Sequence, residues 1–435
     1  MKKFISTRLQ HSTFFAWFIC ALAALFYTYE YLLRIEPGIM IRQLRTYFVI
    51  TDGGLGLLAS MYYWAYTPLQ LAVGLITDRF GARLVLISAI LTCVIGTWIF
   101  GFTHSYFIAS AGRFLVGTGS AFAFVGALKL AADWLPRQYF SFYVGLCTSL
   151  GMIGAMFGET AMSWVVDHFS WHPVIIDSVW LGTILIGIFF FCVYEKRDFS
   201  DKSPQVRKRS MKLLGQSLFK IMSSRMLWQA GFIGCALFLS LSLLAEQWGN
   251  SYFQKALHIN EQMASYYVDM IFLGWFIGSP FHGFLSEKFR SRRRTLLYGC
   301  IMSLVCFMPI ILCPHALPKW GLAGLLFLFA FFSSAEISCF AMARDLVELR
   351  LTATAVGFMN ACVMVGGMII QPCFGFLLNF LSGGDHLVSH YTFKEYQTAL
   401  YIIPVFLLIS IVVAYFMKDS YEMGVSMRRQ DKIHL

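Results

Sequence analysis

Long apolar segments recur along almost the whole chain, and they constrain its fold more than any other feature. A transmembrane helix needs about 20 mainly apolar residues. Twelve segments of roughly this length follow one another, near residues 13–34, 54–76, 83–102, 106–131, 140–166, 172–194, 227–252, 263–286, 295–314, 320–346, 352–381 and 395–417. The sequence therefore predicts an all-α membrane protein with 12 transmembrane helices.

The composition excludes two other classes of protein. Of the 435 residues, 58% are hydrophobic and 13% are charged, more apolar surface than a soluble chain of this length could cover. The net charge of +11 could indicate a nucleic-acid partner. The basic residues form no stripe interleaved with exposed aromatic residues, however, and no zinc or helix-turn-helix spacing occurs, so nucleic-acid binding is not expected.

The positions of Lys and Arg predict the orientation. With the N-terminus inside, the inner segments carry 26 of these residues and the outer loops carry 6, which places both termini in the cytoplasm. The motif Ala21-Leu22-Ala23 resembles a signal-peptidase site, but the apolar run continues to Tyr29. Cleavage there would leave an odd number of spans, so we expect the first segment to be retained.

A polar loop motif occurs twice, once in each half of the chain. The sequence Gly-x-x-x-Asp-Arg-Phe begins at Gly74, and a degenerate copy followed by four arginines begins 209 residues later at Gly283. Glycines let two helices approach closely, and an acid–base pair can latch the end of a helix to the opposite half. Further glycines of the fifth span recur 212 residues later in the eleventh. The repeats predict two six-helix bundles, at 1–194 and 227–417, joined by a basic linker at 195–226 and followed by a tail at 418–435.

The repeated motif resembles the loop signature of major facilitator superfamily transporters. This resemblance implies parallel six-helix repeats that rock about a substrate site at the membrane midplane. The stretch 29–40 is similar to the first span of a bacterial branch that includes phagosomal nutrient transporters and relatives of the lysosomal dipeptide transporter. The gating residues that the motifs imply are Gly74, Asp78, Arg79, Gly81, Arg83, Gly283, Glu287, Lys288, Arg344 and Asp345.

Ionisable residues inside predicted spans are candidates for substrate binding or proton coupling, because each costs about 2.5–3.5 kcal/mol to insert. Glu30 and Arg34 are four residues apart and so lie on one helix face, where they could pair with each other or bind a zwitterion. Arg113 resembles the arginine that the family ties to proton coupling or anion binding. The other candidates are Glu159, Glu246, Glu336 and Asn360.

Glu159 also separates this chain from one class of transporter. The fifth span matches the glycines of the efflux-pump signature at Gly145, Gly154 and Gly158, but Glu159 replaces the proline that follows. This departure argues against a drug:proton antiporter. A carboxylate here could instead accept a proton or an amine.

These features predict a secondary active transporter. No Walker sequence is present, so ATP is not expected to drive it. By resemblance the cargo is an amino acid or short peptide, imported with protons; the alternatives are an organic anion, a nucleoside or a siderophore, or export. A transport-dead sensor is a remote alternative. No nucleophile-elbow or zinc-ligand spacing occurs, and the 11 cysteines show no metal spacing, so we expect no enzyme, cofactor or metal site. A monomer in the bacterial inner membrane is the expected state.

Overall fold

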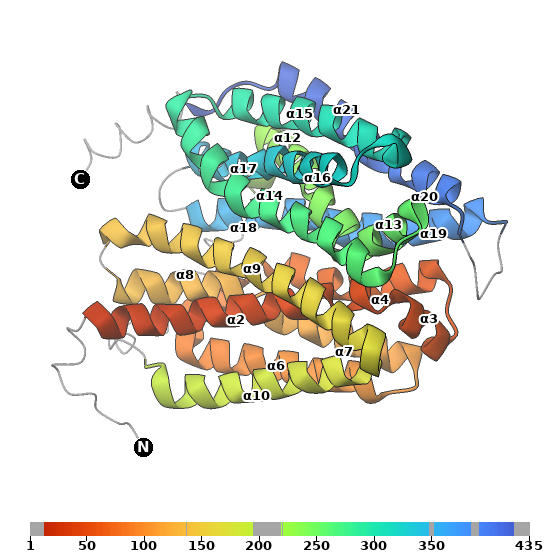
Figure 1. Ribbon diagram of the computed structural model, residues 1–435. Helices are drawn as coiled ribbons and strands as arrows, with labels where there is room; N and C mark the ends of the chain where they lie inside the picture. The colour runs from red at the N-terminus through yellow and green to blue at the C-terminus, as the bar shows by residue number, and fades with distance from the viewer. Residues whose placement is uncertain are drawn as a thin grey trace.

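The computed structural model describes residues 13–135, 137–194, 219, 221–347, 352–383 and 391–421. Within these ranges every regular element is helical and no strand occurs. The predicted all-α class is confirmed. The helices run back and forth along one axis, with the first half of the chain packed against the second (Figure 1).

The first half of the chain forms one layer of the bundle, and its helices follow the predicted apolar segments. Two of the segments are broken, at Gln70–Ala72 and at Ala121–Phe122. The helices are α2 Thr13–Ile39, α3 Ile41–Phe48, α4 Asp52–Leu69, α5 Val73–Phe80, α6 Ala82–Phe102, α7 Tyr106–Ser120, α8 Ala123–Trp134, α9 Arg137–Phe169 and α10 His172–Cys192.

The second half forms the other layer, and three of its spans contain a change of helix type. Their order is α12 Arg225–Leu239, η1 Ser240–Trp248, α13 Gly249–Leu257, α14 Glu261–Lys288, α15 Arg292–Leu312, η2 Pro314–Ala316, α16 Lys319–Ser333, η3 Ser334–Glu336, α17 Ile337–Asp345, α18 Thr352–Val365, η5 Gly366–Ile370, α19 Gln371–Leu381, α20 Phe393–Leu400 and α21 Ile402–Phe416. Here η1 and η5 are π-helical, whereas η2 and η3 are 3₁₀-helical.

Among the described residues, ten segments are long and apolar enough to cross a membrane. The two remaining predicted spans correspond to α4 with α5 and to α9, which are helical but are not among these ten. Large apolar side chains such as Phe107 and Phe191 are exposed on the outside of the bundle, as lipid-facing residues are. The count of twelve spans, the cytoplasmic termini and the domain boundaries stay predictions; most of the linker 195–226 lies outside the described residues.

Helix α2 begins and α21 ends at the same end of the bundle, which we call the termini side (left in Figure 1). Towards the opposite side the halves touch at glycines. A Cβ added to Gly38 of α2 would lie 2.1 Å from the backbone oxygen of Glu246, and one added to Gly375 of α19 would lie 2.2 Å from that of Asp52. Glycine is needed at both positions because no side chain fits between the backbones.

The motif glycines lie nearer the termini side and have different surroundings. A Cβ added at Gly74 or Gly283 would meet no atom within 4 Å, although one added at Gly357 would approach the backbone oxygen of Gln70. The backbones of the two halves are therefore in contact at Gly38 and Gly375, a contact that we call the seal, and also at Gly357, while Gly74 and Gly283 are not pressed against a neighbour.

We predict that Gly38→Ala opens this seal. The new methyl group would overlap the Glu246 carbonyl, and overpacking of this kind costs about 1–3 kcal/mol. The reactivity of Met40→Cys toward an impermeant maleimide should rise several-fold, measured in a parent that lacks the exposed Cys313 and Cys373. Gly187→Ala is the control, because nothing lies within 4 Å of its Cβ position. Equal reactivity in both variants would contradict the prediction.

Candidate functional site

A buried ion pair on α2 lies at the centre of the most polar contact between the halves. The Arg34 Nη2 lies 2.6 Å from Glu30 Oε1, and the Arg34 Nε donates to the same oxygen over 3.0 Å. Both side chains are almost completely buried. The spacing of four residues therefore produces the pair that the sequence predicted, by placing both side chains on one helix face.

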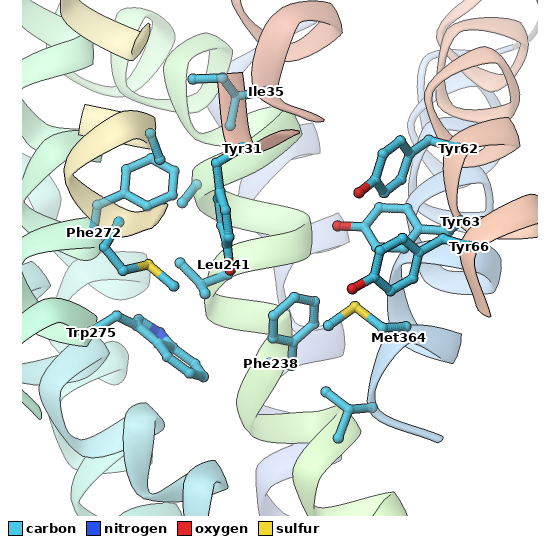
Figure 2. Packing of buried hydrophobic residues seen from close by; sticks show 14 of the residues in the cluster. Tyr31, Ile35, Tyr62, Tyr63, Tyr66, Phe238, Leu241, Phe272, Trp275 and Met364 are labelled. Atoms are coloured by element: carbon cyan, nitrogen blue, oxygen red, sulfur yellow. The ribbon is translucent and has the colours of Figure 1, made fainter. Parts of the chain in front are cut away.

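Tyrosines of α4 and α2 surround this pair. Tyr62 donates its hydroxyl to Glu30, and the Arg34 guanidinium lies 4.4 Å from the ring centre of Tyr31 and 5.4 Å from that of Tyr66. Figure 2 shows the hydroxyls of Tyr62, Tyr63 and Tyr66 directed the same way, toward Tyr31. The rings stabilise the cation by cation–π attraction and hold it away from apolar side chains.

The second half contributes one carboxylate to this cluster, Glu246 of η1. Tyr63 donates its hydroxyl to Glu246 across the boundary between the halves, and Glu246 Oε1 lies 3.7 Å from Arg34 Nη1. The residues that meet here, which we call the central cluster, are Glu30, Arg34, Tyr62, Tyr63 and Glu246.

Three polar atoms of the central cluster have no hydrogen-bond partner among the described residues. They are Glu30 Oε2, Arg34 Nη1 and Glu246 Oε1, and all three are buried. A buried polar group left without a partner costs about 1–3 kcal/mol, and more if it is charged. One donor and two acceptors of the same cluster are therefore open to a ligand that carries both an anionic group and hydroxyls, and two of them, Arg34 Nη1 and Glu246 Oε1, lie 3.7 Å apart.

Arg113 of α7 lies behind this cluster rather than in it. Its Nη1 donates over 2.7 Å to the backbone oxygen of Leu33, and its Nη2 lies 3.5 Å from that of Arg34. The guanidinium thus supports the backbone of α2 at the residue that carries the functional cation. Glu36, which the sequence analysis did not single out, is also buried here and accepts from Ser178 over 2.6 Å.

The structure places Glu159 in a different contact, between α9 of the first half and α13 and α14 of the second. Glu159 accepts a hydrogen bond of 2.5 Å from Asn250 and one of 3.3 Å from Ser265. Thr160 donates to Asp269 in the same seam. These contacts make Glu159 a polar link between the halves.

The last two candidates from the sequence lie in the second half. Asn360 of α18 is next to the hydroxyl of Tyr66, so it borders the central cluster. Glu336 of η3 is buried, and it makes no hydrogen bond or ion pair with the residues that the structure describes. Among the candidates, the charged side chains of Glu30, Arg34 and Glu246 are thus brought together, and Arg113 contacts the backbone of Arg34.

Glu287, Arg344 and Asp345, which the motifs predict to be gating residues, form a network with Arg292. The buried Arg292 lies 3.0 Å from Asp345 and 2.5 Å from Glu287, and it donates to Ser286 over 2.6 Å. Arg344 approaches Glu287 and Asp345 at 3.5 and 3.4 Å. The sequence had assigned Arg292 only a topological role, because burial at the start of a helix cannot be read from a run of arginines.

In the first half, Gly81 has a φ of +87° and separates α5 from α6. Arg83 donates over 2.7 Å to the backbone oxygen of Phe190, and Lys288 occupies the last turn of α14. The side chains of Asp78 and Arg79 lie outside the described set.

Comparisons with known proteins agree with this architecture. The sequence profile of the Major Facilitator Superfamily matches residues 12–335 and 249–430. The chain is 24% identical to the "Probable sulfoacetate transporter SauU" of Cupriavidus necator, covering 83% of this chain and 86% of the relative. It is 23% identical to the D-galactonate transporter of Escherichia coli, covering 76% and 81%.

Among solved structures, a bacterial homologue of the human lysosomal transporter Spinster, inward-facing and unoccupied, gives a TM-score of 0.74. Its identity is 14%, over 96% of this chain and 99% of that one. A D-xylose–proton symporter gives a TM-score of 0.73 at 13% identity, over 95% and 99%. At these identities the likeness concerns the fold.

We predict that Arg292→Ala destabilises the folded protein. Removing the buried partner of Asp345 breaks the 3.0 Å ion pair and leaves the half-exposed Arg344, 3.4 Å away, as a weaker counter-ion, at a cost of about 3 kcal/mol. Thermal unfolding of the detergent-purified protein should show a lower Tm. The matched control is Arg294→Ala, two residues away and exposed, whose Tm should stay at the wild-type value. A wild-type Tm for Arg292→Ala would refute the structural role of this network.

Proposed function

The chain belongs to the major facilitator superfamily, and on this premise we propose that it imports a small organic anion together with protons. The family and the similar proteins are transporters, so the chain is a secondary transporter and not an enzyme. It is a multi-pass integral membrane protein of the bacterial inner membrane. The nature of the cargo and the coupling to protons are the parts that we propose.

The observation that carries the proposal is Arg34 Nη1 at the boundary of the two halves, a buried donor that makes no hydrogen bond to the described residues. A buried guanidinium binds a carboxylate or sulfonate through charge-assisted hydrogen bonds, which are about twice as strong as neutral ones. A hydroxyl on the same solute could donate to Glu30 Oε2 or Glu246 Oε1. Similar proteins named for sulfoacetate, galactonate and galactarate or glucarate transport support this class of cargo.

Coupling to protons follows from the charges of the central cluster. Arg34 faces two carboxylates, Glu30 and Glu246, at 2.6 and 3.7 Å. The cluster therefore carries one excess negative charge when both are ionised, and an anionic solute adds another. Two uncompensated charges in a poorly hydrated interior are strongly unfavourable, so we propose that at least one proton enters with each anion.

A zwitterionic amino acid or short peptide, which the sequence favoured, is the second candidate. Its ammonium group could bind Glu30 Oε2, which is buried without a partner. Against it, the other oxygen of Glu30 already accepts from Arg34 and Tyr62. The organic anion uses Arg34 Nη1, which faces Glu246 without a hydrogen bond, and leaves the bonds of Glu30 intact. We therefore place it first.

We further propose supporting roles for the candidates outside the central cluster. Arg113 positions the α2 backbone, Glu159 links the halves on the α9–α14 seam, and Asn360 borders the site through Tyr66. A role for Glu336 is proposed only as a second protonatable group, since its surroundings offer no counter-ion in the described ranges.

Uptake into proteoliposomes tests the proposal. With an imposed inward proton gradient, labelled sulfoacetate or D-galactonate should accumulate, whereas labelled amino acids and dipeptides should not. Arg34→Gln should reduce uptake about 10- to 100-fold, because a hydrogen bond to a charged group contributes about 1.5–3 kcal/mol.

Arg42→Gln serves as the control, because Arg42 is an exposed cation of α3 outside the central cluster. Accumulation of amino acids or dipeptides in place of both acids would favour the second candidate. If uptake of these acids were the same with and without the proton gradient, proton coupling would be rejected.

A further inference from the structure

Glu246 and Glu30, the two carboxylates of the central cluster, differ in how closely they are bound to Arg34. Both Arg34 bonds to Glu30 are short, and they join neighbouring turns of one helix. Glu246 comes from the opposite half and lies 3.7 Å from Arg34 Nη1, too far for a hydrogen bond. Both atoms of this loose pair lack any hydrogen bond to the described residues.

The groups that face Glu246 are few. On α2 they are Arg34, Glu30 and Tyr31, and on α4 the facing group is Tyr63, which donates to it. Arg34 is the one cation in this set, and it is shared with Glu30. A second anionic group can bind Arg34 Nη1 only if Glu246 moves away or loses its charge.

We propose that Glu246 occupies the anion-binding position of the empty transporter and that the substrate anion replaces it when Glu246 takes up a proton. This inference rests on the proposed function, since it describes how the same site is loaded. In the exchange, the Glu246 carboxylate takes up a proton, and Arg34 transfers its pairing from Glu246 to the carboxylate or sulfonate of the solute.

The charge of the site supports a one-for-one exchange. With Arg34, Glu30 and Glu246 ionised, the empty site carries one excess negative charge. With one proton and one monoanion bound, the excess is again one. Substrate alone would raise it to two, which makes uptake without a proton unfavourable. The empty and fully loaded forms thus present the same charge to the apolar interior.

The position of Glu246 also ties this exchange to the contact between the halves. Its side chain accepts from Tyr63 of the first half, and its backbone oxygen lies where a Cβ of Gly38 would be. When the Glu246 side chain leaves Arg34, the backbone contact between Glu246 and Gly38, which is part of the seal, is therefore directly affected.

The test is anion binding to the purified full-length protein at about pH 5.5 and about pH 7.5, where one linked proton changes affinity by at most about tenfold per pH unit. The probes are labelled D-galactonate, the monoanion for which the one-for-one balance holds, and labelled sulfoacetate, a dianion; both stay ionised over this range. The wild type should bind at least about fivefold more tightly at the lower pH. Glu246→Gln should bind with the same affinity at both, no weaker than the wild type at low pH. In proteoliposomes it should retain counterflow and lose gradient-driven accumulation.

Glu30→Gln is the matched comparison, because Glu30 faces the same guanidinium but is not proposed to exchange. Its affinity should fall while its pH dependence persists. If Glu246→Gln does not fold, Glu246→Asp withdraws the carboxylate by one methylene, and its affinity near pH 7.5 should exceed that of the wild type.

The outcomes separate this inference from the proposed function. Wild-type transport of either acid, with pH-dependent binding that persists in Glu246→Gln or disappears in Glu30→Gln, would overturn the exchange and leave the function standing. The absence of binding and transport of both acids in the wild type would overturn the function and this inference together.

Discussion

The guanidinium of Arg34 is a permanent charge buried between two helical bundles, and the surrounding side chains compensate this charge. A charge in an apolar interior is tolerated only with partners close by. Glu30 supplies the counter-ion and three tyrosine rings supply further stabilisation. Arg113 fixes the backbone that carries Arg34. The second half of the chain completes the site with Glu246, so the cation is fully surrounded only when the halves are together.

Two kinds of contact hold the halves together on the side opposite the termini. Glycines at Gly38 and Gly375 let backbones touch, and polar side chains such as Glu159 and Asn250 bond across the α9–α14 seam. Contacts between helices inside a membrane gain little from the hydrophobic effect, because lipid tails are as apolar as the side chains. Association in such an environment depends on close packing and hydrogen bonds, which are individually small and can be exchanged. A seal built in this way can open without exposing a hydrophobic core.

The helices could be predicted from the sequence because their length reflects the thickness of the bilayer, and the pair of Glu30 and Arg34 could be predicted because it is local. The partners that complete the site could not. Tyr63 and Glu246 are separated by 183 positions along the chain. The sequence did not show that Arg113 bonds to the α2 backbone or that Glu159 bonds across the seam between the halves. Such placements depend on how the two halves dock.

A change of helix type explains why the direction of the Glu246 side chain could not be predicted from the sequence pattern. Glu246 lies in the π-helical segment η1, Ser240–Trp248, where the backbone bonds skip one residue more than in an α-helix. Gly249 ends this segment, and a Cβ there would lie 2.2 Å from the Leu244 oxygen. Counting at 3.6 residues per turn from α12 would therefore point Glu246 away from its observed direction. A second π segment, Gly366–Ile370, precedes Gln371, which donates to the backbone oxygen of Ser242 within η1. The irregular turns of the second half thus support each other and set the face that meets Arg34.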